Sequence, residues 1–212
     1  MRYKSILFDF DGTLADSRKG IVNGVKYACG QMGLTEGAPW EDWKSYIGPT
    51  VYRYTTEVLG LNEAGRDRFM HLYSVYYESK GIFEAPLYEG IKELLGELRT
   101  KGRLLYLASS KPRLLAEKSL EYLGLRLDGA VCAEGELFGK REIIERCLAI
   151  HSIERESAVM VGDRDSDILG ARSNGLASIA VSYGYGGLEE LQESAPCHIA
   201  ASVAELKEIL LA

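Results

Sequence analysis

The chain has 212 residues, of which 46% are hydrophobic and 26% are charged, and its formal net charge is -6. This length can form one large domain or a core with a smaller insert, and the composition is typical of a soluble globular protein. The acidic balance without a basic stripe argues against a nucleic-acid partner. No apolar run reaches the roughly 18 residues that a membrane-spanning helix needs, so no membrane partner is expected.

The first predicted element is a short strand that ends in two carboxylates. Residues 6–8 (Ile-Leu-Phe) form an apolar run just before a turn at Gly12, which is typical of a strand buried on both faces of a sheet. Asp9 and Asp11 follow that strand, and burying carboxylates there is costly unless a cation or hydrogen bonds compensate. We expect these two residues to take part in chemistry; a turn with solvated aspartates is the alternative.

Residues 16–85 show no convincing strand and form a predicted helical insert. Helices are expected near 17–32, 40–59 and 63–80. The segment holds both tryptophans and seven of the thirteen tyrosines. Such a module most simply has a small core of its own, although some rings could instead face a substrate.

From residue 86 to residue 212, helical and strand patterns alternate. Strands are expected at 104–108, 130–132, 158–161 and 178–181, with helices between them. Strands separated by helices of this length imply right-handed βαβ units and a parallel sheet. The predicted fold class is therefore α/β, with a Rossmann-like core from residues 1–15 and 86–212 and an inserted helical domain from residues 16–85.

The cysteines indicate a cellular compartment. Cys29, Cys132, Cys147 and Cys197 show no CxxC spacing and lie in apolar stretches of sequence. This pattern favours reduced core residues over a disulfide framework or a metal site. The beginning of the chain does not resemble a secretory signal, so a cytoplasmic protein is expected.

Polar residues follow each of the predicted strands. They are Asp9 and Asp11, then Ser109, Ser110 and Lys111, then Lys140 at the start of a helix, and finally Asp163 and Asp167. The carboxyl ends of parallel strands lie along one edge of a sheet, so these residues are expected to converge. Crowded carboxylates favour a hard divalent cation, and Mg²⁺ fits better than Ca²⁺ because few protein ligands are available. The hydroxyl of Ser109, the two lysines, and backbone N–H groups after Phe10 and Ser109 suit a phosphate dianion.

These motifs resemble those of the haloacid dehalogenase (HAD) superfamily of phosphatases over nearly the whole chain. Residues 9–14 (Asp-Phe-Asp-Gly-Thr-Leu) fit its first motif, and Ser109, Lys140 and the run from Gly162 to Asp167 fit the other three. The helical insert resembles the superfamily's type 1 cap. Residues 48–50 (Gly-Pro-Thr) and 181–186 are similar to the phosphoglycolate phosphatase-like group, which includes small-metabolite and 5′-nucleotide phosphatases.

The resemblance implies a role for each matching residue. Asp9 would be the nucleophile that forms an aspartyl-phosphate, and Asp11 the general acid and base. Mg²⁺ would be held by Asp9, the backbone carbonyl of Asp11 and Asp163, with Asp167 supporting the metal or the lysine. Ser109 and Lys140 would hold the transferring group. Further substrate contacts are assigned to Phe10, Ser110 and Lys111. In the cap, Thr50 and Arg53 are candidate substrate contacts, and a surface or packing role is the alternative for both.

Two departures from the family pattern leave alternatives open. Ser109-Ser110 replaces a frequent Thr-Asn pair, and Arg141 follows Lys140 where proline is common, so Lys111 remains a second candidate for the charge-neutralising lysine. A phosphomutase would use the same motifs, and a non-catalytic Mg²⁺-binding regulatory module is the alternative from another class. The expected partner is a small phosphate ester, and the chain is either a monomer or a homodimer.

Overall fold

The computed structural model describes residues 3–47, 51–135, 137 and 139–212. The chain divides into two compact units. The core unit consists of Met1–Asp16 and Leu87–Ala212, and the helical unit consists of Ser17–Pro86. The helical unit is thus an insertion after the first strand of the core unit.

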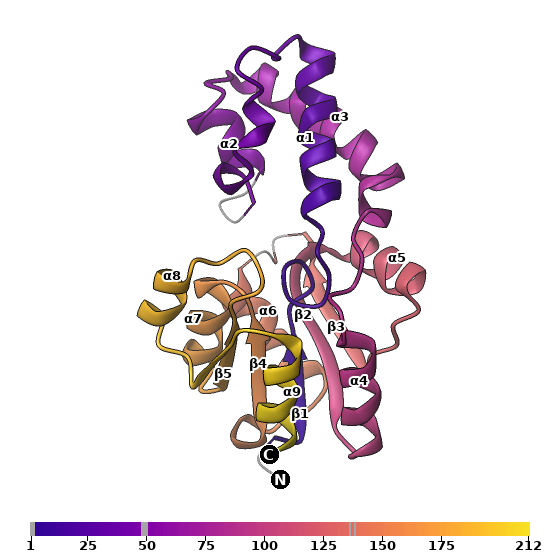
Figure 1. Ribbon diagram of the computed structural model, residues 1–212, viewed down its shortest axis with the longest axis vertical. Coiled ribbons are helices and arrows are strands. Elements are labelled where there is room, and N and C mark those ends of the chain that lie inside the picture. Colours follow the sequence, from indigo (N-terminus) through magenta and orange to yellow (C-terminus); the bar gives the residue numbers. More distant parts are fainter. Residues whose placement is uncertain (1–2, 48–50, 136, 138) are drawn as a thin grey trace. The chain divides into compact units, whose positions relative to one another are not determined.

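A six-stranded sheet lies at the centre of the core unit (Figure 1). Its strands are β1 (Ser5–Phe8), β2 (Leu104–Pro112), β3 (Gly129–Ala133), β4 (Ala158–Gly162), β5 (Ala177–Val181) and β6 (His198–Ala200). The spatial order is β3-β2-β1-β4-β5-β6, and each neighbouring pair is parallel. The predicted α/β fold class is confirmed. The edge strand β6 was not predicted, because its three residues are too few to show a periodic pattern.

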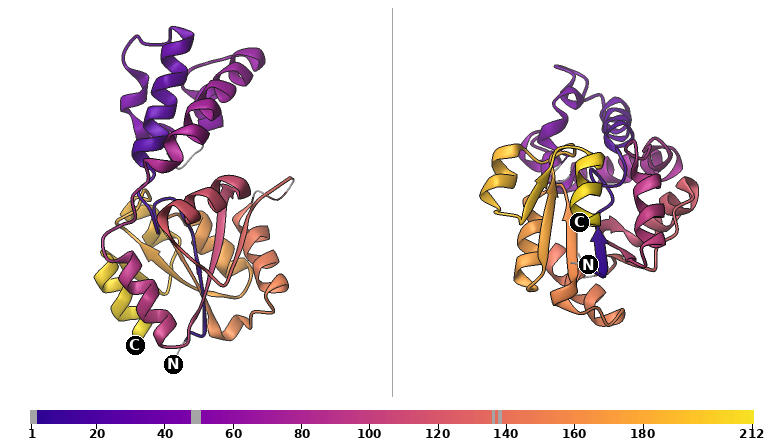
Figure 2. Two further views of the ribbon diagram at one scale, coloured as in Figure 1. Left: turned by 90° about the vertical axis from the view of Figure 1, so that its right-hand side faces the viewer. Right: turned by 60° about the horizontal axis from the view of Figure 1, so that its bottom comes forward.

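Helices cover both faces of this sheet. They are α4 (Ile91–Thr100), α5 (Arg113–Leu123), α6 (Lys140–Ile150), α7 (Asp165–Ser173), α8 (Leu188–Glu193) and α9 (Val203–Leu211). Helices α6 and α7 pack against each other and against β2 to β5, whereas α4 packs against α9, as the magenta and yellow helices of Figure 2 show. No helix in the described part of the chain is both long and apolar enough to cross a membrane.

The two central strands explain why the site residues are fixed in place. Every residue of β1 and of β4 is buried, because each strand has neighbours on both sides and helices on both faces. The backbone N–H of Asp9 donates to the carbonyl of Val161 at 2.9 Å, which extends the β1–β4 pairing to the first residue after β1. The carboxyl ends of both strands are therefore held side by side.

The helical unit contains α1 (Arg18–Met32), α2 (Val51–Glu57) and α3 (Glu63–Ser79). The single helix expected over residues 40–59 is wrong: the segment holds two short 3₁₀ turns, Pro39–Glu41 and Trp43–Ser45, followed by α2. The sequence itself argues against one continuous helix, because Pro49, which lies outside the described residues, has no backbone N–H to donate.

Aromatic residues form the interior of the helical unit. Tyr46, Tyr54 and Phe69 are almost fully buried, and their rings are in series, with centroids 4.9 Å apart for the first pair and 6.5 Å for the second. The Tyr54 hydroxyl donates to the carbonyl of Pro39 at 2.9 Å. These rings form a core of the unit's own, as expected from the sequence.

The four cysteines are free thiols, and three of them are buried. The expectation of four core cysteines is wrong for Cys197, which is exposed. This residue directly precedes the edge strand β6, and its backbone N–H donates to the carbonyl of Ser178. A position at the border of the sheet leaves its side chain uncovered.

Candidate active site

Lys140, the first residue of α6, connects two of the carboxylates. Its Nζ lies 2.9 Å from Oδ1 of Asp9 and 2.8 Å from Oδ1 of Asp167, and it also donates to the carbonyl of Ala108 at 3.1 Å. Burial alone would lower the pKa of this lysine, but the charges of Asp167 and Asp9 outweigh burial and raise the pKa above its ordinary value. Lys140 is therefore charged over the whole physiological range.

Asp163 follows β4 and is completely buried. Its Oδ1 accepts a hydrogen bond from the Thr13 hydroxyl at 3.1 Å, and its Oδ2 accepts one from the backbone N–H of Tyr185 at 2.8 Å. Burial, together with the charges of Asp167 and Asp9, raises the pKa of Asp163 well above its ordinary value. A carboxylate held only by neutral donors among the described residues would be favoured in its charged form by an added cation.

Asp167 lies in the first turn of α7 and is also completely buried. Besides its contact with Lys140, it accepts a hydrogen bond from the backbone N–H of Arg164 at 3.1 Å. Burial raises its pKa to about 6, although the charge of Lys140 acts in the opposite direction. Both carboxylate oxygens of Asp167 are thus used to fix α6 and the start of α7.

Asp11 and Lys111 form a second ion pair. Nζ of Lys111 lies 2.9 Å from Oδ1 and 3.2 Å from Oδ2 of Asp11, and 5.1 Å from the ring centroid of Phe10. The two lysines therefore have separate partners: Lys140 contacts Asp9, and Lys111 contacts Asp11. Ser109 is buried and accepts a hydrogen bond from the backbone N–H of Lys111 at 3.3 Å, while Ser110 is exposed.

Three of the predicted metal ligands lie close together. Carboxylate oxygens of Asp9, Asp163 and Asp167 all lie within 4.8 Å of one another, so this group could hold a metal ion. The carboxylate of Asp11 is not part of the group, and its side chain is engaged by Lys111.

The two predicted cap residues, Arg53 and Thr50, belong to the helical unit. Arg53 lies on α2 of the helical unit, is exposed, and pairs with Glu57 at 2.8 Å. Thr50 lies outside the described residues. The assignment of both residues to the substrate stays a prediction.

The loop after β5 makes contacts at the site that the sequence did not predict. Tyr185 holds Asp163 through its backbone, and the Tyr183 hydroxyl donates to the carbonyl of Thr13 at 3.1 Å. A Cβ atom at Gly184 would lie 2.4 Å from the Cβ of Asp163, so only glycine fits there. The spacing of the glycines at 184, 186 and 187 is the available signal in the sequence, but a backbone N–H donor has no side-chain signature.

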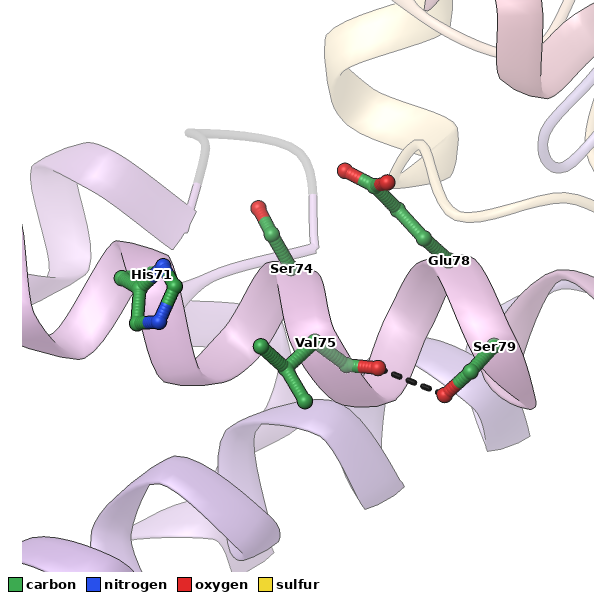
Figure 3. Close-up of a pocket in the computed structure, with 5 residues that line it drawn as sticks. All are labelled: His71, Ser74, Val75, Glu78 and Ser79. Carbon is green, nitrogen blue, oxygen red and sulfur yellow. Dashed lines mark hydrogen bonds between the residues drawn. The ribbon is translucent and has the colours of Figure 1, made fainter.

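A separate pocket of about 370 Å³ runs along α3 of the helical unit (Figure 3). His71, Ser74, Val75, Glu78 and Ser79 line it, and the Ser79 hydroxyl donates to the carbonyl of Val75. None of these residues was predicted as a site residue, and the exposed Val75 is their only apolar member. This pocket therefore adds nothing to the candidate active site.

Comparisons with known proteins identify the family to which this chain belongs. Residues 6–181 match the family model of haloacid dehalogenase-like hydrolases. A 5′-nucleotidase of Pseudomonas aeruginosa is 34% identical, with 99% of this chain and 96% of the relative aligned. The tyrosine-protein kinase PtkA of Mycobacterium tuberculosis is 32% identical over 97% of this chain and 72% of its own length. Phosphoglycolate phosphatases such as that of Vibrio parahaemolyticus are more distant, at 28%.

A solved structure from Clostridium difficile has the same fold, with a TM-score of 0.92, 34% identity and 99% of both chains covered. The chain belongs to the haloacid dehalogenase-like hydrolase family. The predicted family and the predicted enzyme class, a phosphoric monoester hydrolase, are both confirmed.

Proposed function

We propose that this chain hydrolyses small phosphate monoesters in two steps, through a phosphoryl group held covalently on Asp9 and with Mg²⁺ as cofactor. The observation that supports it most is the ion pair between Lys140 and Asp9, at 2.9 Å, at the end of the central strand. The pair orients a carboxylate oxygen and places a fixed positive charge beside it, where a phosphoryl group would arrive.

The acidic group has the chemistry that Mg²⁺ requires. All its ligand atoms are carboxylate oxygens. Among the described residues, the hydrogen bonds that the buried Asp163 accepts come from uncharged groups, the Thr13 hydroxyl and the Tyr185 N–H. Asp9 and Asp163 would hold the ion, and Asp167, whose oxygens already bind Lys140 and the Arg164 N–H, would hold the lysine. When bound, Mg²⁺ supplies charge neutralisation between the anionic nucleophile and the anionic phosphate.

In the first step, a carboxylate oxygen of Asp9 attacks phosphorus, and the bond from phosphorus to the leaving oxygen breaks. The leaving oxygen takes a proton from Asp11. Lys140 and the Ser109 hydroxyl bind oxygens of the transferring group. Lys111, which contacts Asp11 at 2.9 Å, would bind the phosphate as well.

In the second step, water attacks phosphorus of the aspartyl-phosphate and gives a proton to Asp11. Inorganic phosphate leaves, and Asp9 returns to its carboxylate form. Asp11 thereby serves as acid and then as base, and no net proton is gained or lost by the enzyme over the cycle.

A metal and substrate screen tests this function. We expect phosphate release from an aryl phosphate with Mg²⁺, full loss of release with a chelator, and recovery when Mg²⁺ is added back. A panel of 5′-nucleotides, phosphoglycolate and sugar phosphates then defines the substrate, with 5′-nucleotides first because a 34% identical relative is a 5′-nucleotidase. Transfer of the group to a sugar phosphate in place of release would instead identify a phosphomutase.

The role of Asp11 is tested by the leaving group. Asp11→Asn is expected to slow hydrolysis of an alkyl phosphate by about 10²-fold or more, because a poor leaving group needs the proton. An aryl phosphate with an acidic phenol needs little protonation, so its covalent step should slow much less. Measuring the rate of phosphoenzyme formation on both substrates checks this, and equal slowing of the two would exclude Asp11 as the acid.

A further inference from the structure

The loop after β5 lies directly against Asp163. A Cβ atom at Gly186 would lie 2.0 Å from the carbonyl oxygen of Asp163, and one at Gly184 would lie 2.4 Å from its Cβ. Between these glycines, the backbone N–H of Tyr185 donates to Oδ2 of Asp163 at 2.8 Å. The position of Tyr185 therefore sets the orientation of a buried carboxylate.

The side chain of Tyr185 reaches the place where the chain leaves the core unit. Its hydroxyl donates to Oδ1 of Asp16 at 3.1 Å, and Asp16 is the last residue before the helical unit begins. The same residue thus binds Asp163 with its backbone and the outgoing connection with its side chain.

The neighbouring Tyr183 makes a parallel set of contacts. The centroids of the Tyr183 and Tyr88 rings are 4.8 Å apart. Tyr88 is the second residue of the segment that returns to the core unit, which begins at Leu87. The backbone N–H of Tyr88 in turn donates to the carbonyl of Leu14 at 3.1 Å. Outgoing and returning connections are therefore both in contact with the loop that carries Tyr185.

We propose that Tyr185 is a positioning residue that couples metal binding at Asp163 to the order of the connection at Asp16. The inference rests on the proposed function, since it takes Asp163 as a metal ligand. A metal ion fixes the Asp163 carboxylate and hence the Tyr185 backbone, and the hydroxyl passes this restraint to Asp16. Coupling between two sites is reciprocal, so loss of the hydroxyl weakens the metal site as well.

The test is a double-mutant cycle on the hydrogen bond from Tyr185 to Asp16, read by direct binding of Mn²⁺. Free Mn²⁺ is measured by electron paramagnetic resonance, without substrate. We expect Tyr185→Phe and Asp16→Ala each to weaken binding by about three- to tenfold, as loss of one supporting hydrogen bond implies. The double variant should be no weaker than either single variant.

Two further variants separate this role from general loss of structure. Asp16→Asn keeps an acceptor oxygen and should bind Mn²⁺ as the parent does. Tyr106→Phe is the matched control, because it removes the hydroxyl of a buried tyrosine of the same unit. The ring of Tyr106 packs against His151. If Tyr185→Phe folds poorly, Asp16→Ala tests the same hydrogen bond from the other partner.

Hydrogen exchange measures the other end of the coupling. Saturating Mn²⁺ should slow amide exchange at Ser17 and Arg18 in the parent, and much less in Tyr185→Phe. Parent-like Mn²⁺ binding in both single variants, or additive losses in the double variant, would overturn the inference. A parent protein that neither binds Mn²⁺ nor releases phosphate would instead overturn the proposed function.

Discussion

Asp9→Asn is expected to lower phosphatase turnover by about 10³-fold or more, because the amide cannot form the acyl-phosphate bond and is a poor metal ligand. The backbone of residue 9 is fixed by its hydrogen bond to Val161, so the fold should survive the change. Steady-state phosphate release at saturating Mg²⁺ measures the loss. Acid quenching with labelled substrate should trap phosphoenzyme in the parent and none in the variant.

The matched control for this change is Asp67→Asn. It alters the net charge equally, but Asp67 is an exposed residue of α3 in the helical unit. We expect parent-like turnover and parent-like labelling for this control. Turnover of Asp9→Asn within about tenfold of the parent would show that another residue is the nucleophile.

Lys140→Met is expected to abolish turnover and also to destabilise the metal-free protein. Asp9 and Asp167 would then lie beside Asp163 without their shared cation. Removing one partner of a buried ion pair typically costs about 3–5 kcal/mol of unfolding free energy. Urea denaturation without metal measures this cost, and Lys118→Met, at an exposed position of α5, is the control.

The destabilisation should depend on pH in a defined direction. In the parent, burial raises the pKa of Asp167 from 3.8 to about 6, although the charge of Lys140 lowers it. Without Lys140, the pKa of Asp167 should rise further. At pH values between the pKa of Asp167 in the unfolded chain and its pKa in the folded protein, the folded state binds more protons than the unfolded state. The free energy of unfolding therefore falls as pH rises. The variant should therefore lose more stability relative to the parent at about pH 8 than at about pH 5. A deficit that is independent of pH would show that packing, not charge, is what Lys140 provides.

Much of this arrangement was predictable because strand ends in a parallel sheet share one edge. The apolar runs at 6–8 and 158–161 place Asp9 and Asp163 at adjacent strand ends, and the same reasoning brings in Lys140 at the start of α6. What the sequence left open was which lysine contacts which aspartate. That pairing depends on how α6 packs on α7. The absence of a side chain at Gly170 lets the aliphatic part of Lys140 come close, and the order of residues in the sequence does not reveal such packing.

Other features lacked a signal of sufficient length or type. The edge strand β6 is three residues long, and the segment near residues 39–57 has helical composition but is divided into short turns before α2. The contribution of Tyr185 to Asp163 comes from a backbone N–H, which every residue except proline possesses. The glycines, and the similarity of residues 181–186 to the phosphoglycolate phosphatase-like group, distinguished that loop in the sequence without indicating this contact.

The point at which the helical unit is inserted has an evolutionary consequence. The outgoing and returning segments pair as neighbouring extended chains at Ala15 and Leu87, so the insertion begins and ends at one place in the core. An inserted segment with adjacent ends can lengthen, shorten or be exchanged by recombination without changing the register of the sheet. Descendants of such a chain could diversify the inserted module while inheriting the sheet edge and its acidic residues intact.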